Sequence, residues 1–163
     1  MIGWGTGGPL YADEIAERRR ESAIHLALQE IADAQGDVDA FIAQESEKSR
    51  TVPSVASEIA RRLLSAGRLK EAWAAINAID ENRRGWIPFE WEEVRLAVME
   101  ALGRNADAQR FRWQCFERGL NGDHLRAFLK RMPDFDDLEA EERAMSYALK
   151  FPEMHPALAF LIS

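Results

Sequence analysis

The sequence predicts an all-α protein, built as a stack of antiparallel helix hairpins with about eight or nine helices in all. Three observations predict this fold class. Apolar residues recur at the spacing of one helix face along most of the 163 residues. Gly36, Gly67 and Gly103 each end one expected helix and precede another, at spacings of 31 and 36 residues. No segment shows the sustained alternation or the Asn-Gly turn of a β-hairpin.

The two ends of the chain differ in character from its middle. The opening MIGWGTGGPL contains four glycines and a proline, so residues 1–12 are expected to form a flexible lead-in. A single helical-repeat domain is expected over residues 13–163, as part of a longer native protein. The closing ALAFLIS is apolar and lacks the polar outer face of a terminal repeat. This segment either folds back into the core, or the native chain continues beyond it, or a second copy covers it.

The first expected helix begins near Asp13, whose charge suits a helix N-terminus, and ends at Gly36. Its buried stripe is predicted at the i, i+4, i+7 spacing of Ile24, Ala27, Leu28 and Ile31. A shorter helix follows, and the polar stretch 44–50 is expected to be an exposed connection.

The next helix is expected to be capped by Thr51, with Pro53 in its first turn and Gly67 at its end. A helix over about 69–79 and a turn come after it. Five more helices complete the chain, over about 89–103, 106–118, 123–131, 136–150 and 156–162.

Two segments of the middle third resemble a known repeat. GRLKEAWAAINAI resembles the second-helix half of a tetratricopeptide repeat, with Gly67 as the turn glycine and Glu71 and Ala72 as the Glu-Ala pair. GRNADAQ, which begins at Gly103, is a weaker copy with Asp107 in place of the glutamate. The resemblance implies a right-handed α-α superhelix of antiparallel helix hairpins.

A second resemblance involves the whole chain. The segments DEIAERRRESAIHLALQEIADAQGDVDAFI and HLRAFLKRMPDFDDLEAEERA resemble an uncharacterised bacterial family that carries a domain-of-unknown-function label. That family supplies no activity, so it implies no functional residue.

Charge and composition exclude several classes of partner. The net charge is −7 and the pI is about 5.1, without a basic face of the kind that binds nucleic acid. No apolar run approaches the roughly 18 residues of a membrane span, and no secretory signal is evident. The sequence therefore predicts a cytoplasmic protein that binds neither nucleic acid nor membrane.

The residues that most often carry chemistry are scattered in this sequence. His25, His124 and His155 lie far apart, and none has a second histidine or a cysteine at metal-ligand spacing. Cys115, the single cysteine, has no nearby histidine in the sequence, which favours a small buried hydrophobe. His124 is expected to have a capping or turn role at the start of a helix. We therefore expect no catalytic, metal-binding or cofactor-binding residue, and no cofactor.

Two groups of residues are candidates for a partner-binding surface. Tryptophans are enriched at interface hot spots, although they also fill gaps between helices. Basic residues on one short helix stand out in an acidic protein, although charge near a helix C-terminus is also mildly stabilising. The candidates are Trp73, Trp86, Trp91, Trp113, Arg126, Lys130 and Arg131.

These observations favour a non-catalytic helical-repeat module that binds a protein or peptide on the concave side of its hairpin stack. The alternative is a structural or self-associating segment of a larger bacterial protein, with a homodimer formed through the apolar C-terminal helix. An enzyme with dispersed carboxylates is the third and least favoured hypothesis.

Overall fold

The computed structural model of the chain describes residues 3–5, 8–10, 12–79, 87–133 and 136–161. Within these residues lie ten helices and one pair of three-residue strands, so the all-α prediction is confirmed outside the N-terminal strand pair. The chain divides into two compact units, Met1–Arg84 and Gly85–Ser163, which are described one at a time.

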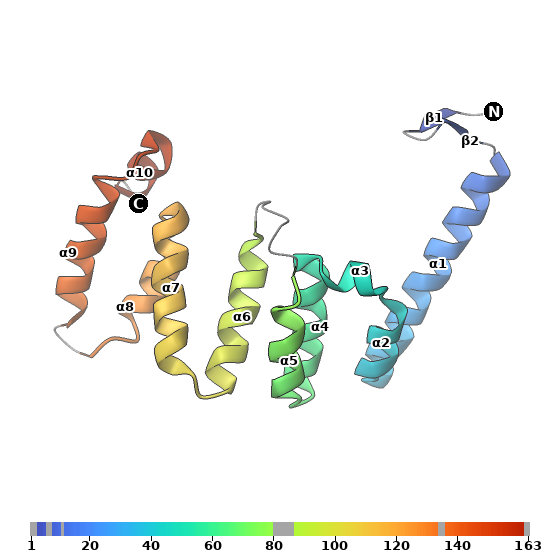
Figure 1. The fold of residues 1–163 in the computed structure, drawn as a ribbon, viewed down its shortest axis with the longest axis horizontal. Coiled ribbons are helices and arrows are strands. Elements are labelled where there is room, and N and C mark those ends of the chain that lie inside the picture. Colours follow the sequence, from blue (N-terminus) through green and yellow to red (C-terminus); the bar gives the residue numbers. More distant parts are fainter. Residues whose placement is uncertain (1–2, 6–7, 11, 80–86, 134–135, 162–163) are drawn as a thin grey trace. The chain divides into compact units, whose positions relative to one another are not determined.

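The first unit begins with antiparallel strands β1 and β2, which pair within the segment expected as a lead-in. Five helices follow, of which α1 packs on α2, and α4 packs on α2, α3 and α5. Figure 1 shows α4 and α5 joined by the turn at their lower ends. The elements are β1 (Gly3–Gly5), β2 (Gly8–Leu10), α1 (Ala12–Gln35), α2 (Val38–Gln44), α3 (Glu47–Arg50), α4 (Pro53–Ser65) and α5 (Leu69–Ile76).

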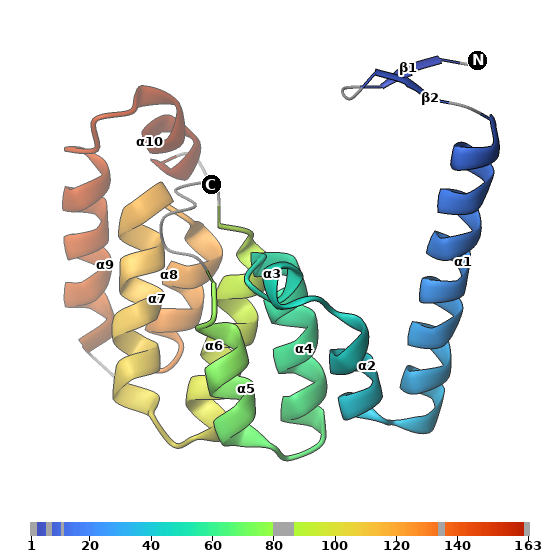
Figure 2. The ribbon, with the colours of Figure 1, turned by 45° about the vertical axis from the view of Figure 1, so that its right-hand side comes forward.

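The second unit is a run of helices in which each packs on the next one in the chain. Figure 2 shows α7, α8 and α9 side by side in this unit. The elements are α6 (Phe89–Ala101), α7 (Asn105–Gly119), α8 (Gly122–Leu129), α9 (Asp136–Ala148) and α10 (Met154–Leu161).

Three hairpins share one turn geometry. Gly36, Gly67 and Gly103 have φ angles of +65°, +73° and +72°, the left-handed region in which a residue with a Cβ is strained. In each turn the residue after the glycine donates its N–H to the carbonyl five residues earlier, at 2.9, 2.8 and 2.9 Å. The prediction that these glycines end helices is therefore confirmed.

Two of these turns share side-chain contacts as well. Arg68 Nε donates to Glu71 Oε1 at 2.8 Å, and Arg104 Nε donates to Asp107 Oδ2 at 2.8 Å. These arginines lower the pKa of both carboxyls, with Arg110 as a second cause at Asp107. The small residues that follow the two acids are fully buried: Ala72 and Ala108.

The predicted buried stripe of α1 is wrong. Its large members are between 47% and 54% exposed, namely Ile24, Leu28 and Ile31. The face of α1 that packs on the unit instead contains Ala32, which is buried, and Gln29, whose Nε2 donates to Glu45 Oε1 at 2.9 Å. The physical reason is the short partner: α2 has only 7 residues against the 24 of α1, so little apolar surface is available to cover the stripe.

The segment before α4 also differs from the prediction. Thr51 does not cap α4, because Val52 occupies the N-cap position, and the hydroxyl of Thr51 donates to the carbonyl of Lys48 at 2.9 Å. Pro53 does stand in the first turn of α4, as predicted. The stretch expected to be a connection contains the four-residue helix α3.

The core of the second unit is centred on Phe116, which is fully buried. Its ring lies 5.4 Å from that of Trp113, 6.1 Å from that of Tyr147 and 5.3 Å from that of Phe160. Since Phe160 belongs to α10, this apolar helix folds back onto its own unit, the first of the three alternatives for the C-terminal segment. No helix within the described residues is long and apolar enough to cross a membrane.

Candidate metal centre

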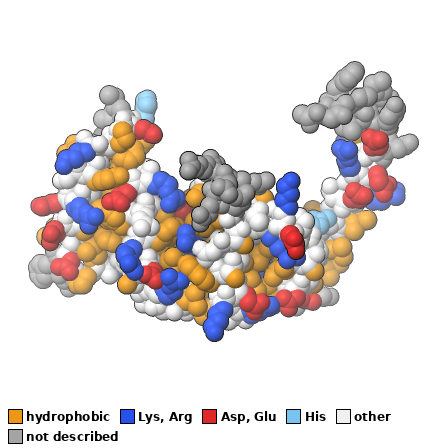
Figure 3. Space-filling model, viewed as in Figure 1, with side chains coloured by type: hydrophobic (Ala, Val, Ile, Leu, Met, Phe, Trp, Pro, Cys, Tyr) orange, Lys and Arg blue, Asp and Glu red, His pale blue; other side chains and the backbone are white. Residues whose placement is uncertain are grey.

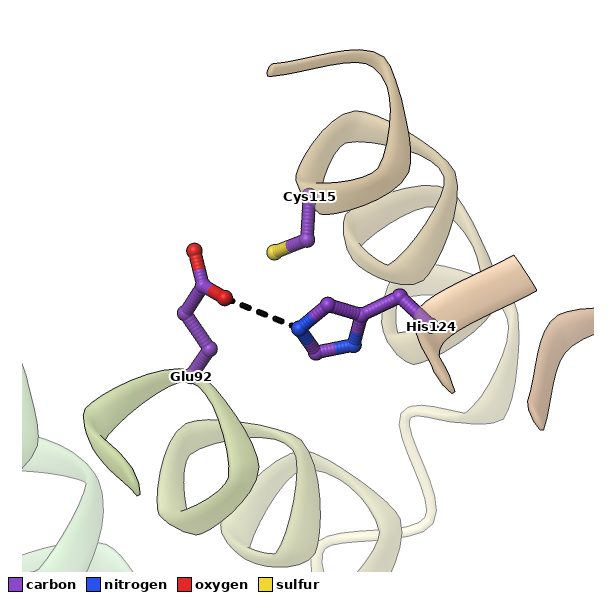
Figure 4. Close-up of side chains that lie close together, drawn as sticks. All are labelled: Glu92, Cys115 and His124. Atoms are coloured by element: carbon purple, nitrogen blue, oxygen red, sulfur yellow. Dashed lines mark hydrogen bonds and ion pairs between the residues drawn. The ribbon is translucent and has the colours of Figure 1, made fainter. Parts of the chain in front are cut away.

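Three buried side chains that carry metal-ligand atoms meet between α6, α7 and α8 (Figure 4). They are Glu92 of α6, Cys115 of α7 and His124 of α8, each between 3% and 8% exposed. One ligand atom from each lies within 4.8 Å of the other two. The structure therefore brings together a carboxylate, a thiol and an imidazole that are separated in the sequence.

Glu92 occupies a core position of α6. Leu96 and Met99, four and seven residues later, are both buried, so Glu92 continues their apolar stripe toward the start of the helix. It lies in the first turn, where the helix dipole favours a negative charge. Both carboxylate oxygens have partners, since Arg118 Nη1 lies 2.9 Å from Oε1 and His124 Nε2 lies 2.8 Å from Oε2.

His124 is held inside the second unit by its ring. The Nε2 atom bonds Glu92, and the ring centroid lies 5.0 Å from that of Phe89 at 53°. The N-cap of α8 is Asn121, whose side-chain oxygen accepts the N–H of Asp123 at 2.9 Å. The predicted helix-start role for His124 is therefore wrong, because Asn121 performs it and the imidazole faces the interior.

Cys115 is buried, which confirms the prediction of a small interior side chain. Burial, and after it the neighbouring Glu92 carboxylate, raises the pKa of its thiol to about 12. A thiol with this pKa is protonated at neutral pH and is a poor nucleophile. No histidine is near Cys115 in the sequence, but His124 lies beside it in the structure. The chain reverses at Leu120, which ends α7 in the left-handed region at φ 51°, and so brings α8 back to α7.

The three donors are chemically suited to a borderline divalent metal. Imidazole nitrogen, thiolate sulfur and carboxylate oxygen are the three protein ligands that zinc accepts. A mixed nitrogen and sulfur set disfavours magnesium and calcium, which prefer oxygen alone. Thiol catalysis is disfavoured by the raised pKa of Cys115 and by the burial of all three groups.

Comparison with protein families gives one match for this chain. The profile of a family of unknown function, DUF6880, matches residues 3–163. The chain belongs to the DUF6880 family. No curated protein and no solved structure matches it. The match extends over both units of the DUF6880 protein and confirms the predicted resemblance of the whole chain to a family without an assigned function.

The candidate tryptophans of the DUF6880 protein occupy different environments. Trp91 and Trp113 are buried in the second unit: Trp91 packs edge-on against Phe111 at 6.2 Å, and Trp113 lies under the guanidinium of Arg143 at 4.3 Å. Little of either side chain is accessible to a partner. Trp73 is half-buried on α5, and Trp86 lies outside the described residues.

The candidate basic residues are exposed at and beyond the end of α8. Arg126 pairs with Asp123 at 2.5 Å, and Arg131 Nε lies 3.0 Å from Glu100 Oε1. Lys130 is the C-cap residue and is exposed. The two arginines are therefore partly neutralised by acids of the same unit.

Sequence reasoning missed the three-residue cluster of the DUF6880 protein. Glu92 and Cys115 are 23 residues apart, and Cys115 and His124 are nine apart, so no short motif contains them. One signal was present. Glu92 stands four residues before Leu96 and seven before Met99, and a charged residue on a buried stripe indicates a polar partner in the interior.

Proposed function

We propose that this DUF6880 protein is a non-catalytic helical-repeat module that binds a helical segment of a partner protein along one face of α9. The observation that carries the proposal is an exposed apolar stripe. Leu138 and Met145 of α9 are exposed, as is Leu149, which follows the helix and donates its N–H to the carbonyl of Met145 at 3.0 Å. Their side chains are between 40% and 72% exposed. At about 100° per residue these positions fall within about 40° of one another around the helix axis.

A different face of α9 attaches this helix to its own unit. Ala140, Ala144 and Ala148 recur every four residues and are buried. The apolar residues of the stripe are therefore not needed for the fold of the second unit. Large apolar side chains held in a row at the surface are typical of a protein-binding face.

The charges beside the stripe indicate the chemistry of the partner. Glu141 and Glu142 are exposed and lie on its two sides, and the first turn of α9 is acidic as well. The whole chain has a net charge of −7. An amphipathic helix with an apolar face and flanking lysines or arginines complements this surface.

The repeat architecture supports a binding role. Three hairpin turns have the same glycine conformation and the same backbone hydrogen bond, and two continue with an arginine–acid pair and a buried alanine. These features favour a tetratricopeptide-like, right-handed α-α superhelix. Stacked hairpins of that kind commonly present extended surfaces to protein segments.

The test uses two designed amphipathic peptides with the same apolar face, one flanked by lysines and the other by glutamates. Fluorescence anisotropy is expected to show binding of the lysine peptide only. Leu149→Lys should weaken that binding by about tenfold or more, since burial of one leucine contributes about 1.5–3 kcal/mol. Ser146→Lys adds the same charge to another exposed part of α9 and serves as the matched control. Equal binding of both peptides, or no effect of Leu149→Lys, contradicts the proposal.

A second candidate function, self-association, is favoured by α1. Ile24, Leu28 and Ile31 follow the alternating four- and three-residue spacing of helices that pair with each other. Figure 3 shows hydrophobic side chains along α1, drawn in orange. The occupant proposed for this face is α1 of a second copy, in preference to α10, whose Phe160 packs on Phe116.

Sedimentation velocity tests self-association directly. The chain is expected to sediment as a concentration-dependent dimer, and Leu28→Glu is expected to yield a monomer. Ser22→Glu, on the other side of α1, is the control and should leave the dimer intact. A monomer at every concentration for the unsubstituted chain excludes this candidate and leaves the peptide-binding proposal unaffected.

A further inference from the structure

We propose that Glu92, Cys115 and His124 bind a zinc ion, with water as the fourth ligand. The protein ligands are a carboxylate oxygen, Sγ and Nε2, contributed by α6, α7 and α8. This site is separate from the α9 surface and does not depend on the proposed binding of a partner. Its effect is to join three helices of the second unit through one ion.

The spacing of the three donors is close to that of a zinc site. Zinc bonds of about 2.0–2.3 Å place neighbouring ligand atoms roughly 3.3–3.7 Å apart. Here Nε2 of His124 and Oε2 of Glu92 are 2.8 Å apart, and all three donors lie within 4.8 Å. Binding of an ion requires the imidazole and the carboxylate to separate slightly and the sulfur to lie within about 3.7 Å of both.

Burial of the cluster carries a desolvation cost. Arg118 and His124 offset this cost for Glu92 in the metal-free chain, and a shared ion offsets it for all three donors. Three polar donors from three separate helices converge, whereas a buried ion pair requires only two. The position of Cys115 beside this pair adds the donor type that most strongly favours zinc over harder cations.

Two cations act on the Cys115 side of the site, Arg118 and Arg95. Arg118 Nη1 lies 2.9 Å from Glu92 Oε1, so its cation competes with a metal for this carboxylate. Its side chain is half-exposed and can turn toward solvent when an ion binds. The guanidinium of Arg95 lies over the rings of Trp91 and Phe111, at 5.0 and 4.7 Å.

An entry route exists on the histidine side. His124 and Phe89 line a surface hollow of about 220 Å³, together with residues of α6, α7 and α8. Of the three donors, only His124 belongs to this lining, together with the acids Glu93, Glu100 and Asp123. We infer that an ion enters from this side, past the imidazole.

The test is titration of the untagged, chelator-treated full chain with Co²⁺, a spectroscopic substitute for zinc. We expect one equivalent to bind, with the visible bands of tetrahedral cobalt and a near-ultraviolet thiolate-to-cobalt band, and Zn²⁺ to displace it. Because Cys115 is the only cysteine, the thiolate band identifies its ligand without ambiguity. Cys115→Ser should remove this band, and His124→Ala should weaken binding at least tenfold.

Two further variants test whether binding occurs at this site. His25→Ala removes a histidine of the first unit and should leave the titration unchanged. Arg118→Gln removes the competing cation and should tighten binding, whereas a purely structural ion pair predicts no effect of this change on metal affinity. Absence of a thiolate band from the folded, unsubstituted chain overturns the proposal, whatever the variants do. Equal Co²⁺ affinity in the unsubstituted, Cys115→Ser and His124→Ala chains overturns it as well.

Discussion

At Gly67 and Gly103 the backbone alone determines which residue is tolerated. Both are in the left-handed region, and no atom lies within 4 Å of the position that a Cβ would occupy. A side chain therefore meets no neighbour, and its cost comes from the φ angle itself. Substitutions at these two glycines therefore measure conformational strain without a contribution from steric crowding.

We expect Gly67→Ala and Gly103→Ala each to lower the free energy of unfolding by about 1–2 kcal/mol, the cost of the left-handed region for a residue with a Cβ. Urea unfolding followed by circular dichroism measures the change. Gly119→Ala is the control, because Gly119 lies in α7 without positive φ and its added Cβ also meets no atom within 4 Å. Alanine there should be neutral or stabilising by about 0.5 kcal/mol. Equal effects at Gly67 and Gly119 contradict the assigned turn geometry.

In the metal-free chain, the thiol of Cys115 makes stability depend on pH in the alkaline range. Its pKa is about 12 in the folded chain against an ordinary value of 9.0. The folded state holds the proton more tightly, so the contribution to stability is complete below pH 9 and is lost as the pH rises toward 12. The free energy of unfolding should therefore fall more steeply over this interval than in Cys115→Ala. Parallel pH profiles for the two proteins contradict the prediction.

At the scale of the element, α7 supplies the core of the second unit through Phe116, which contacts rings from α9 and α10 as well as Trp113 of α7. α9 has both a buried alanine face and an exposed apolar stripe. Large apolar side chains therefore build the core on α7, whereas on α9 they are exposed and available for binding.

Phe116→Ala is expected to lower the free energy of unfolding by about 3–5 kcal/mol, because it leaves a cavity that three rings line. Leu138→Ala removes a similar apolar group from the exposed stripe and should change stability by less than about 0.5 kcal/mol. Denaturant titration of both variants compares the two sites. A large loss at Leu138 means that α9 uses its stripe within the fold.

Most helices could be predicted from the sequence because their ends have local signals. Gly67, Gly103 and Pro53 fix helix ends through their own backbone preferences, which depend little on the remainder of the chain. The stripe of α1 was predicted wrongly since periodicity shows which residues share a face, and only packing decides whether that face is covered. Leu28 is on the expected face but lacks a covering helix of sufficient length.

The three-residue cluster illustrates the same limit at a smaller scale. Glu92, Cys115 and His124 come from three helices, so their meeting depends on helix rotation as well as helix position. A rotation of α8 by one residue, about 100°, points His124 elsewhere. The place of Glu92 before Leu96 and Met99 is a local signal in the sequence, but it does not identify the partners of the carboxylate.

At the scale of the whole molecule, the net charge of −7 attracts a basic partner over a distance, before the two make contact. We expect the association rate of the lysine-flanked peptide to fall several-fold between about 50 and 300 mM salt, since added ions screen the long-range attraction. The dissociation rate should change much less. Surface plasmon resonance resolves the two rates, and a salt dependence confined to dissociation contradicts this account.

The shared turn also bears on how chains of this family change in length. The hydrogen bond that closes each turn joins two residues only five positions apart, and the glycine conformation needs no distant contact. Each hairpin therefore contains all the residues that form its own turn. Duplication or loss of one hairpin leaves the other turns intact. We therefore expect DUF6880 chains to differ in length by steps of one hairpin, close to the 31 and 36 residues that separate the three glycines.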